Sequence, residues 1–186
     1  KSMLIKAWLS RLAQVDDNSL MYIFDSIVKP EYALGSDGTY ETSLAKEIGA
    51  QVLRFGDPNQ TFGFDPFIVF ENKRDAGEFI RELAKLEEGS EEAVEILSLA
   101  KECSSIDDLV NKASGPLRRR LVAELEPMWR FFTGKTDIYD RMVFVLSDVA
   151  SPFVRDALAF LILGSIWRVI KDQPTSQKKF IVVDEG

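Results

Sequence analysis

Two short segments carry residue types that suit phosphate and metal chemistry. The apolar run at residues 180–183 is followed directly by Asp184 and Glu185. This is the pattern of a Walker B motif. A buried strand brings an Asp that can hold a magnesium ion through its water shell, and a Glu that can polarise an attacking water. Many strands end in an acid that only caps a neighbouring helix, so the pattern alone is weak.

The start of the chain strengthens this interpretation. Lys1 and Ser2 lead at once into an amphipathic helix, as the last two residues of the P-loop Gly-x-x-x-x-Gly-Lys-Ser do. In that motif the lysine reaches the β- and γ-phosphates, the serine hydroxyl ligates magnesium, and the helix start attracts anions. An arbitrary start at these two residues is the alternative.

Together, the two half-motifs predict one site for ATP and Mg²⁺. Lys1 and Ser2 would bind the nucleotide, Ser2 and Asp184 would hold the metal, and Glu185 and Lys1 would be catalytic. The glycine-rich part of the loop is expected ahead of Lys1, so we expect the chain to be inactive by itself.

Two other segments also contain residues that could take part in phosphate or metal binding. Asp25 closes the apolar run at residues 20–24, so it could support the metal from the second shell or merely end a strand, and both alternatives stay open. Gly134-Lys135-Thr136 looks like the end of a P-loop, but Trp129 stands where the first glycine would be. A turn before a strand is the better interpretation there.

The elements that must position these residues alternate between strands and helices. Continuous apolar runs predict buried strands at 20–24, 142–146 and 180–183, and a second short strand is expected at 51–55. Helices are expected at 3–15, 42–49 and 153–171. Between them, charged helical segments are expected at 74–87, 91–102, 106–113 and 117–132. The chain is therefore predicted to be α/β. Residues 1–72 and 135–186 would form a core with a parallel sheet, and 73–134 an all-helical insertion.

Composition excludes several classes of protein. The chain has 186 residues, of which 46% are hydrophobic, and this is enough for a real core. It contains no histidine, which excludes His-based catalysis and His-ligated zinc, and the single Cys103 excludes an internal disulfide. The net charge of −7 limits nucleic-acid contact to a local patch.

The order of these features resembles one family, the motor ATPases of type IV secretion and conjugation of the TraC kind, relatives of the HerA and FtsK DNA pumps. The resemblance covers nearly the whole chain. Segments that match the family's elements are Tyr22-Ile23-Phe24-Asp25 with Glu31-Tyr32, residues 45–55, Phe64-Asp65-Pro66-Phe67, residues 144–149, residues 163–168 and residues 179–185. Three positions differ: Ser26 replaces a proline, Glu31 lies six rather than four positions after Asp25, and Asp65 replaces an asparagine.

The resemblance implies a RecA-like P-loop core that hydrolyses ATP to energise DNA or protein transfer, or channel assembly. It further implies a homo-hexamer, secretion-channel proteins and DNA as candidate partners, and a cytoplasmic location at the inner face of the membrane. Two alternatives stay open: a HerA-like DNA translocase in repair, and a non-enzymatic interaction module with degenerate nucleotide motifs.

Overall fold

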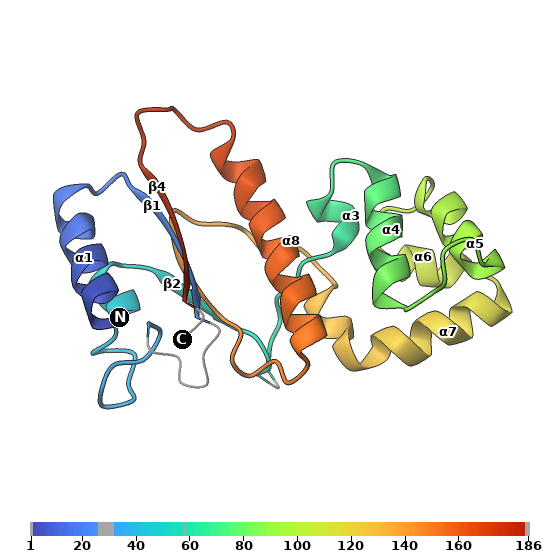
Figure 1. Ribbon diagram of the computed structural model, residues 1–186, viewed down its shortest axis with the longest axis horizontal. Helices are drawn as coiled ribbons and strands as arrows, with labels where there is room; N and C mark the ends of the chain where they lie inside the picture. The colour runs from blue at the N-terminus through green and yellow to red at the C-terminus, as the bar shows by residue number, and fades with distance from the viewer. Residues whose placement is uncertain (1, 26–31, 58, 185–186) are drawn as a thin grey trace. The chain divides into compact units, whose positions relative to one another are not determined.

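The computed structural model describes residues 2–25, 32–57 and 59–184, and these form an α/β fold with a parallel sheet, as predicted (Figure 1). The described strands are β1 (Leu20–Asp25), β2 (Gln51–Arg54), β3 (Arg141–Val145) and β4 (Lys179–Asp184). The described helices are α1 (Ser2–Val15), α2 (Leu44–Glu47), α3 (Pro66–Val69), α4 (Lys73–Leu83), α5 (Glu91–Ala100), α6 (Ile106–Lys112), α7 (Gly115–Leu125), the 3₁₀-helix η1 (Glu126–Phe131) and α8 (Pro152–Ile170).

The chain divides into two compact units. Unit 1 comprises Lys1–Gln60, Asp137–Arg155 and Ile166–Gly186, and it contains the sheet. Unit 2 comprises Thr61–Thr136 and Asp156–Ser165, so the two ends of α8 belong to unit 1 and its middle to unit 2. The described elements of unit 2 are helical. The boundaries drawn from the sequence at residues 72 and 134 stay a prediction.

In unit 1 the strands lie in the order β2-β3-β1-β4, and every pair is parallel. Every residue of Leu20–Asp25 is buried, as a continuous apolar run predicts for a central strand. β1 and β2 are parallel members of this sheet, but they are not neighbours, because β3 lies between them.

The expectation that β4 is buried was wrong. Among the described strands β4 is an edge strand, and Ile181 and Val183 are 44% and 55% exposed. The opposite edge is more polar, because Gln51 and Arg54 are the exposed residues of β2. An apolar run therefore predicted the strand correctly but not its place in the sheet.

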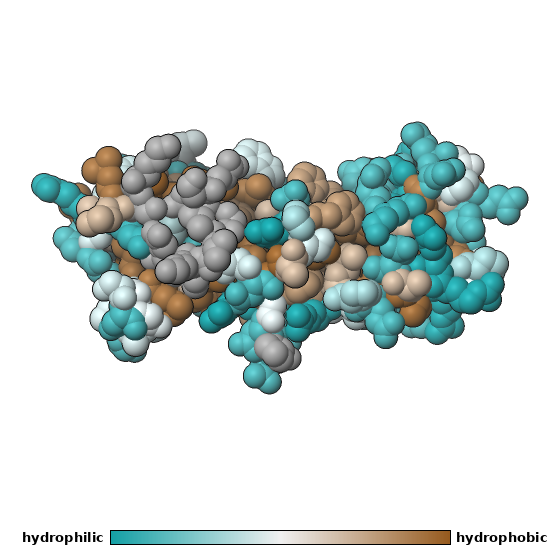
Figure 2. Space-filling view, turned by 60° about the horizontal axis from the view of Figure 1, so that its bottom comes forward, coloured by the Kyte–Doolittle hydropathy of each residue, from teal (hydrophilic) through white to brown (hydrophobic). Residues whose placement is uncertain are grey.

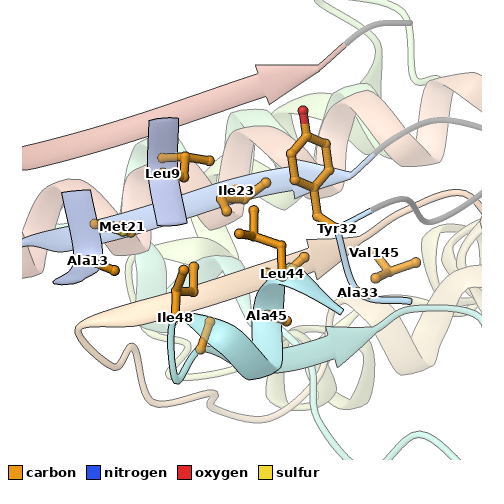
Figure 3. Packing of buried hydrophobic residues seen from close by; sticks show 12 residues of the cluster. Leu9, Ala13, Met21, Ile23, Tyr32, Ala33, Leu44, Ala45, Ile48 and Val145 are labelled. Atoms are coloured by element: carbon orange, nitrogen blue, oxygen red, sulfur yellow. The ribbon is translucent and has the colours of Figure 1, made fainter. Parts of the chain in front are cut away.

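One face of the sheet packs against α1 and α2 (Figure 3). Alternate residues of the central strands point to this face, because side chains along a strand point to opposite sides in turn. The buried cluster consists of Leu9, Ala13, Met21, Ile23, Tyr32, Ala33, Leu44, Ala45, Ile48, Ala50, Val143 and Val145.

Side-chain caps fix the starts of α3, α4, α5 and α6 in unit 2. At the start of α5, the Ser90 hydroxyl accepts the backbone N–H of Ala93 at 3.2 Å. The helix expected over 117–132 is divided into α7 and η1, because Pro127 lacks the N–H that an α-helix would need there. Figure 2 shows mostly hydrophilic side chains over these helices, in keeping with their charged sequence. No helix in the described ranges is both long and apolar enough to cross a membrane.

Candidate nucleotide and metal site

The carboxyl ends of three parallel strands form the candidate site. In the register of β1 and β4, Asp25 is the partner of Asp184, and in that of β1 and β3 it is the partner of Val145. Ligands of open parallel sheets bind at this edge, outside the carboxyl ends of the strands. The backbone position predicted for the Walker B aspartate thus lies beside the end of the central strand.

The start of α1 lies at the same end of the sheet. A connection of only four residues, 16–19, joins α1 to β1, so the helix runs back along the strand and begins where β1 ends. Figure 1 shows the first turn of α1 and the ends of β1 and β4 at this end of unit 1. The fold therefore brings the backbones of Ser2 and Asp184 to one edge, although 182 positions separate them.

The side chains of four predicted site residues lie outside the described part of the chain. Lys1 and Glu185 lie outside the described residues, as do the side chains of Ser2 and Asp184. Within the described part of the chain, no group of three or more acidic, Cys or His side chains could hold a metal ion. The assignment of phosphate, metal and catalytic roles to these four residues stays a prediction.

The side chain of Asp25 lies within the described residues, and its carboxylate forms a hydrogen bond with the backbone of Tyr32. The residue is completely buried, and its Oδ2 accepts the backbone N–H of Tyr32 at 2.9 Å. Its backbone carbonyl accepts the N–H of Leu146 at 2.9 Å, which continues the pairing of β1 with β3. Asp25 thus ends its strand and holds the chain where it returns at Tyr32. Support of a metal from the second shell stays a prediction.

Sequence reasoning gave no role to Tyr32 or Lys6. Tyr32 is completely buried in the cluster beneath α1, and Lys6 Nζ lies 5.4 Å from the centroid of its ring. Lys6 is on α1, four positions after Ser2, and this spacing puts both residues on one side of the helix. The regular apolar spacing of α1 was the signal used for the helix, and Lys6 lies outside that pattern.

Two hollows are lined by described residues of unit 1, one near the start of α2 and one near the amino ends of β2 and β3. One, of about 430 Å³, lies beside α1 and α2, and its lining includes Lys6, Ser10, Gly35, Thr42 and Glu47. The other, of about 580 Å³, has a lining that includes Gly49, Gln51, Tyr139 and Arg141, at the amino ends of β2 and β3. Only the first shares a residue, Lys6, with the surroundings of Tyr32.

The second P-loop-like segment is a structural turn, as expected. Gly134 has a φ of +81°, a conformation that glycine adopts without strain, and its carbonyl accepts the N–H of Asp65 at 3.1 Å. Thr136 Oγ1 donates to the carbonyl of Gly63 at 2.7 Å. The hydroxyl that would ligate magnesium in a P-loop is therefore used to hold this turn.

No family model matches the chain, and no curated protein or solved structure is significantly similar to it.

Proposed function

We propose that the chain is the core of an ATP-hydrolysing motor of the type IV secretion or conjugation kind, built on a RecA-like P-loop fold. One observation carries the proposal: α1 begins, and β1 and β4 end, at the same edge of a parallel sheet. The two half-motifs of the sequence fall on that start and that end. Such a meeting of a helix start with a strand end is what a phosphate-magnesium site needs.

The start of α1 suits a bound phosphate. The first turn of α1 contains no acidic residue, whereas α5 begins with Glu91 and Glu92. Acidic side chains in the first turn offset the partial positive charge of a helix start. Because α1 lacks such acidic side chains, the backbone N–H groups of its first turn and its dipole favour binding of an anion.

In the proposed reaction, the four predicted site residues have different roles in binding ATP and hydrolysing it. Lys1 and Ser2 bind and orient the phosphates, and Asp184 holds a water of the metal's shell. Magnesium supplies neutralisation of the phosphate charge when it is bound. Glu185 orients the attacking water and takes its proton, which a carboxylate at hydrogen-bonding distance can do.

The wider setting follows from the resemblance. A homo-hexamer would work at the inner face of the membrane with secretion-channel proteins. The net charge of −7 implies that DNA contact, if part of this function, belongs to a local loop or the pore of the ring.

The test separates ATP binding from hydrolysis. In the full-length protein, Glu185→Gln keeps the size of the side chain but removes the proton acceptor, so turnover should fall by about 100-fold or more while ATP still binds. Asp172→Asn, an exposed acid ahead of β4, is the matched control and should leave both unchanged. Unchanged hydrolysis in Glu185→Gln would remove that residue's role. A wild-type protein that ATP does not protect against unfolding would favour the non-enzymatic interaction module instead.

A further inference from the structure

The candidate site includes a completely buried acidic side chain, that of Asp25. Burying a carboxylate is costly unless hydrogen bonds compensate it. Asp25 is completely buried, and its Oδ2 accepts the N–H of Tyr32 at 2.9 Å. The end of β1 is thereby bonded directly to the backbone of Tyr32.

The ring of Tyr32 is held from a different element. It lies in the buried cluster with Leu9 of α1, and Lys6 Nζ lies 5.4 Å from its centroid (Figure 3 shows the ring among its neighbours). An ammonium over an aromatic face is attracted to the ring, more strongly where water is excluded. Tyr32 is therefore held by β1 through its backbone and by α1 through its ring.

These contacts join the two halves of the candidate site. Lys6 lies one turn after Ser2 on α1, and Asp25 is the register partner of Asp184 on β4. We propose that Asp25, Tyr32 and Lys6 form a clamp that fixes the start of α1 relative to the ends of β1 and β4. In this arrangement Tyr32 is a positioning residue. The inference rests on the proposed function.

The clamp has a specific consequence for ATP binding. In the proposed site the phosphates contact the start of α1, and the metal also needs the end of β4. ATP bound without magnesium depends on the helix start alone, whereas Mg·ATP depends on the separation of the two elements. Loosening the clamp should therefore weaken binding of Mg·ATP more than binding of free ATP, because misplacement by about 1 Å can be costly at such a site.

The experiment measures the dissociation constant of ATP for the full-length protein with magnesium and with EDTA, and divides the EDTA value by the magnesium value. Lys6→Met removes the cation from a partly exposed position, and the ratio should fall by about two- to fivefold, the value of a cation–π contact. Tyr32→Leu removes the ring, and the ratio should fall by about fivefold or more. In both variants the affinity in EDTA should stay within about twofold of wild type.

Two controls isolate the clamp. Tyr32→Phe keeps the ring and should keep the ratio. Lys46→Met removes a similar contact, since Lys46 Nζ lies 5.6 Å from the ring centroid of Tyr40 elsewhere in unit 1, and it should also leave the ratio unchanged. A parallel loss of affinity with magnesium and EDTA, or no change in the ratio for Lys6→Met and Tyr32→Leu, would overturn the proposal.

A second readout does not depend on nucleotide. Amide hydrogen exchange of residues 6–9 should be severalfold faster in Lys6→Met than in wild type and unchanged in Lys46→Met, because only the first variant frees α1. If the wild-type protein binds ATP neither with magnesium nor with EDTA, the proposed function is wrong. Amide hydrogen exchange then tests the clamp independently of nucleotide. Equal exchange in wild type and Lys6→Met would overturn the clamp itself.

Discussion

The carboxylate of Asp65 accepts the backbone N–H of Ile106 at 3.1 Å, across 41 positions of the sequence. Its other oxygen accepts the N–H of Phe67 at 2.9 Å and so caps α3. One side chain, only 2% exposed, thereby serves the first residues of both α3 and α6. In the sequence, Asp65 is notable only because it replaces an asparagine of the family that the chain resembles.

Asp65 makes the stability of the protein depend on pH. Burial raises the pKa of its carboxyl to about 6 from 3.8, and the charge of Asp107 acts in the same direction against the two N–H donors. Between these values the folded state binds more protons than the unfolded state. The free energy of unfolding therefore falls as pH rises from about 4 to 6, by at most about 3 kcal/mol for this group.

Asp65→Asn should remove this dependence. The difference in unfolding free energy between wild type and the variant, from urea titrations, should favour wild type more at pH 4 than at pH 7. Asp107→Asn should shift the window to lower pH, because it removes a charge that raises the pKa of Asp65. A difference that does not change with pH would contradict the assignment.

Gly63 is placed where a side chain does not fit. A Cβ there would lie 2.1 Å from the carbonyl oxygen of Thr133 and 2.8 Å from that of Arg130. Gly63→Ala should therefore cost about 1–3 kcal/mol of stability, as overpacking does. Gly115→Ala is the matched control at the start of α7, where the nearest atom lies at 3.7 Å, and it should be neutral or stabilise by up to about 1 kcal/mol. Equal thermal midpoints for both variants would contradict this account.

Arg141, at the start of β3, connects the amino end of the sheet to two neighbouring loops. Its guanidinium donates to the carbonyls of Asp16 and Asp17 at 3.0 Å each, and to that of Ile48 at 2.9 Å. The three donors of a lysine ammonium sit on one nitrogen, so they cannot reproduce bonds that Arg141 makes from two nitrogens of its planar guanidinium. Arg141→Lys should therefore destabilise the protein by about 1–3 kcal/mol in chemical denaturation. Arg54→Lys, at an exposed ion pair with Asp148, should change stability by less than about 1 kcal/mol.

Sequence patterns predicted those elements whose signal is local. Residues 20–24 are continuously apolar and form the central strand, and Ser90 before two acids begins α5. α3 was missed because four residues are too few to show a helical period. Its cap, Asp65, bonds locally to the N–H of Phe67, but the second bond of Asp65 reaches Ile106 at the start of α6. Local patterns carry no such long-range information.

The candidate site shows the same limit. Strand ends and a helix start predicted which backbone positions would meet, and the register of Asp25 with Asp184 agrees with that expectation. The bond from Asp25 to Tyr32 depends on how the chain returns after β1. The ring contact of Lys6 depends on the packing of α1. Neither contact follows from the spacing of residues in the sequence. The sequence therefore drew attention to Tyr32 only as part of a segment that resembles the family.

Among the described strands β4 is an edge strand with exposed apolar residues, and these should make the protein self-associate. Ile181 and Val183 project from an edge strand, and Trp8, 50% exposed, has its ring 5.3 Å from that of Phe180 on the same strand. Apolar edge strands pair with other chains, and a lysine on the edge prevents this. Ile181→Lys should raise severalfold the concentration at which association appears in sedimentation velocity. Its stability should change by about 0.5 kcal/mol or less, because the site is exposed.

The other edge of the sheet supplies the control. Gln51 is exposed on β2, so Gln51→Lys adds the same charge to an edge that is already polar. It should leave association unchanged, because the apolar edge of β4 is still present. Association that falls equally in both variants would point to net charge as the cause. Association that persists in Ile181→Lys would show that β4 is not the contact.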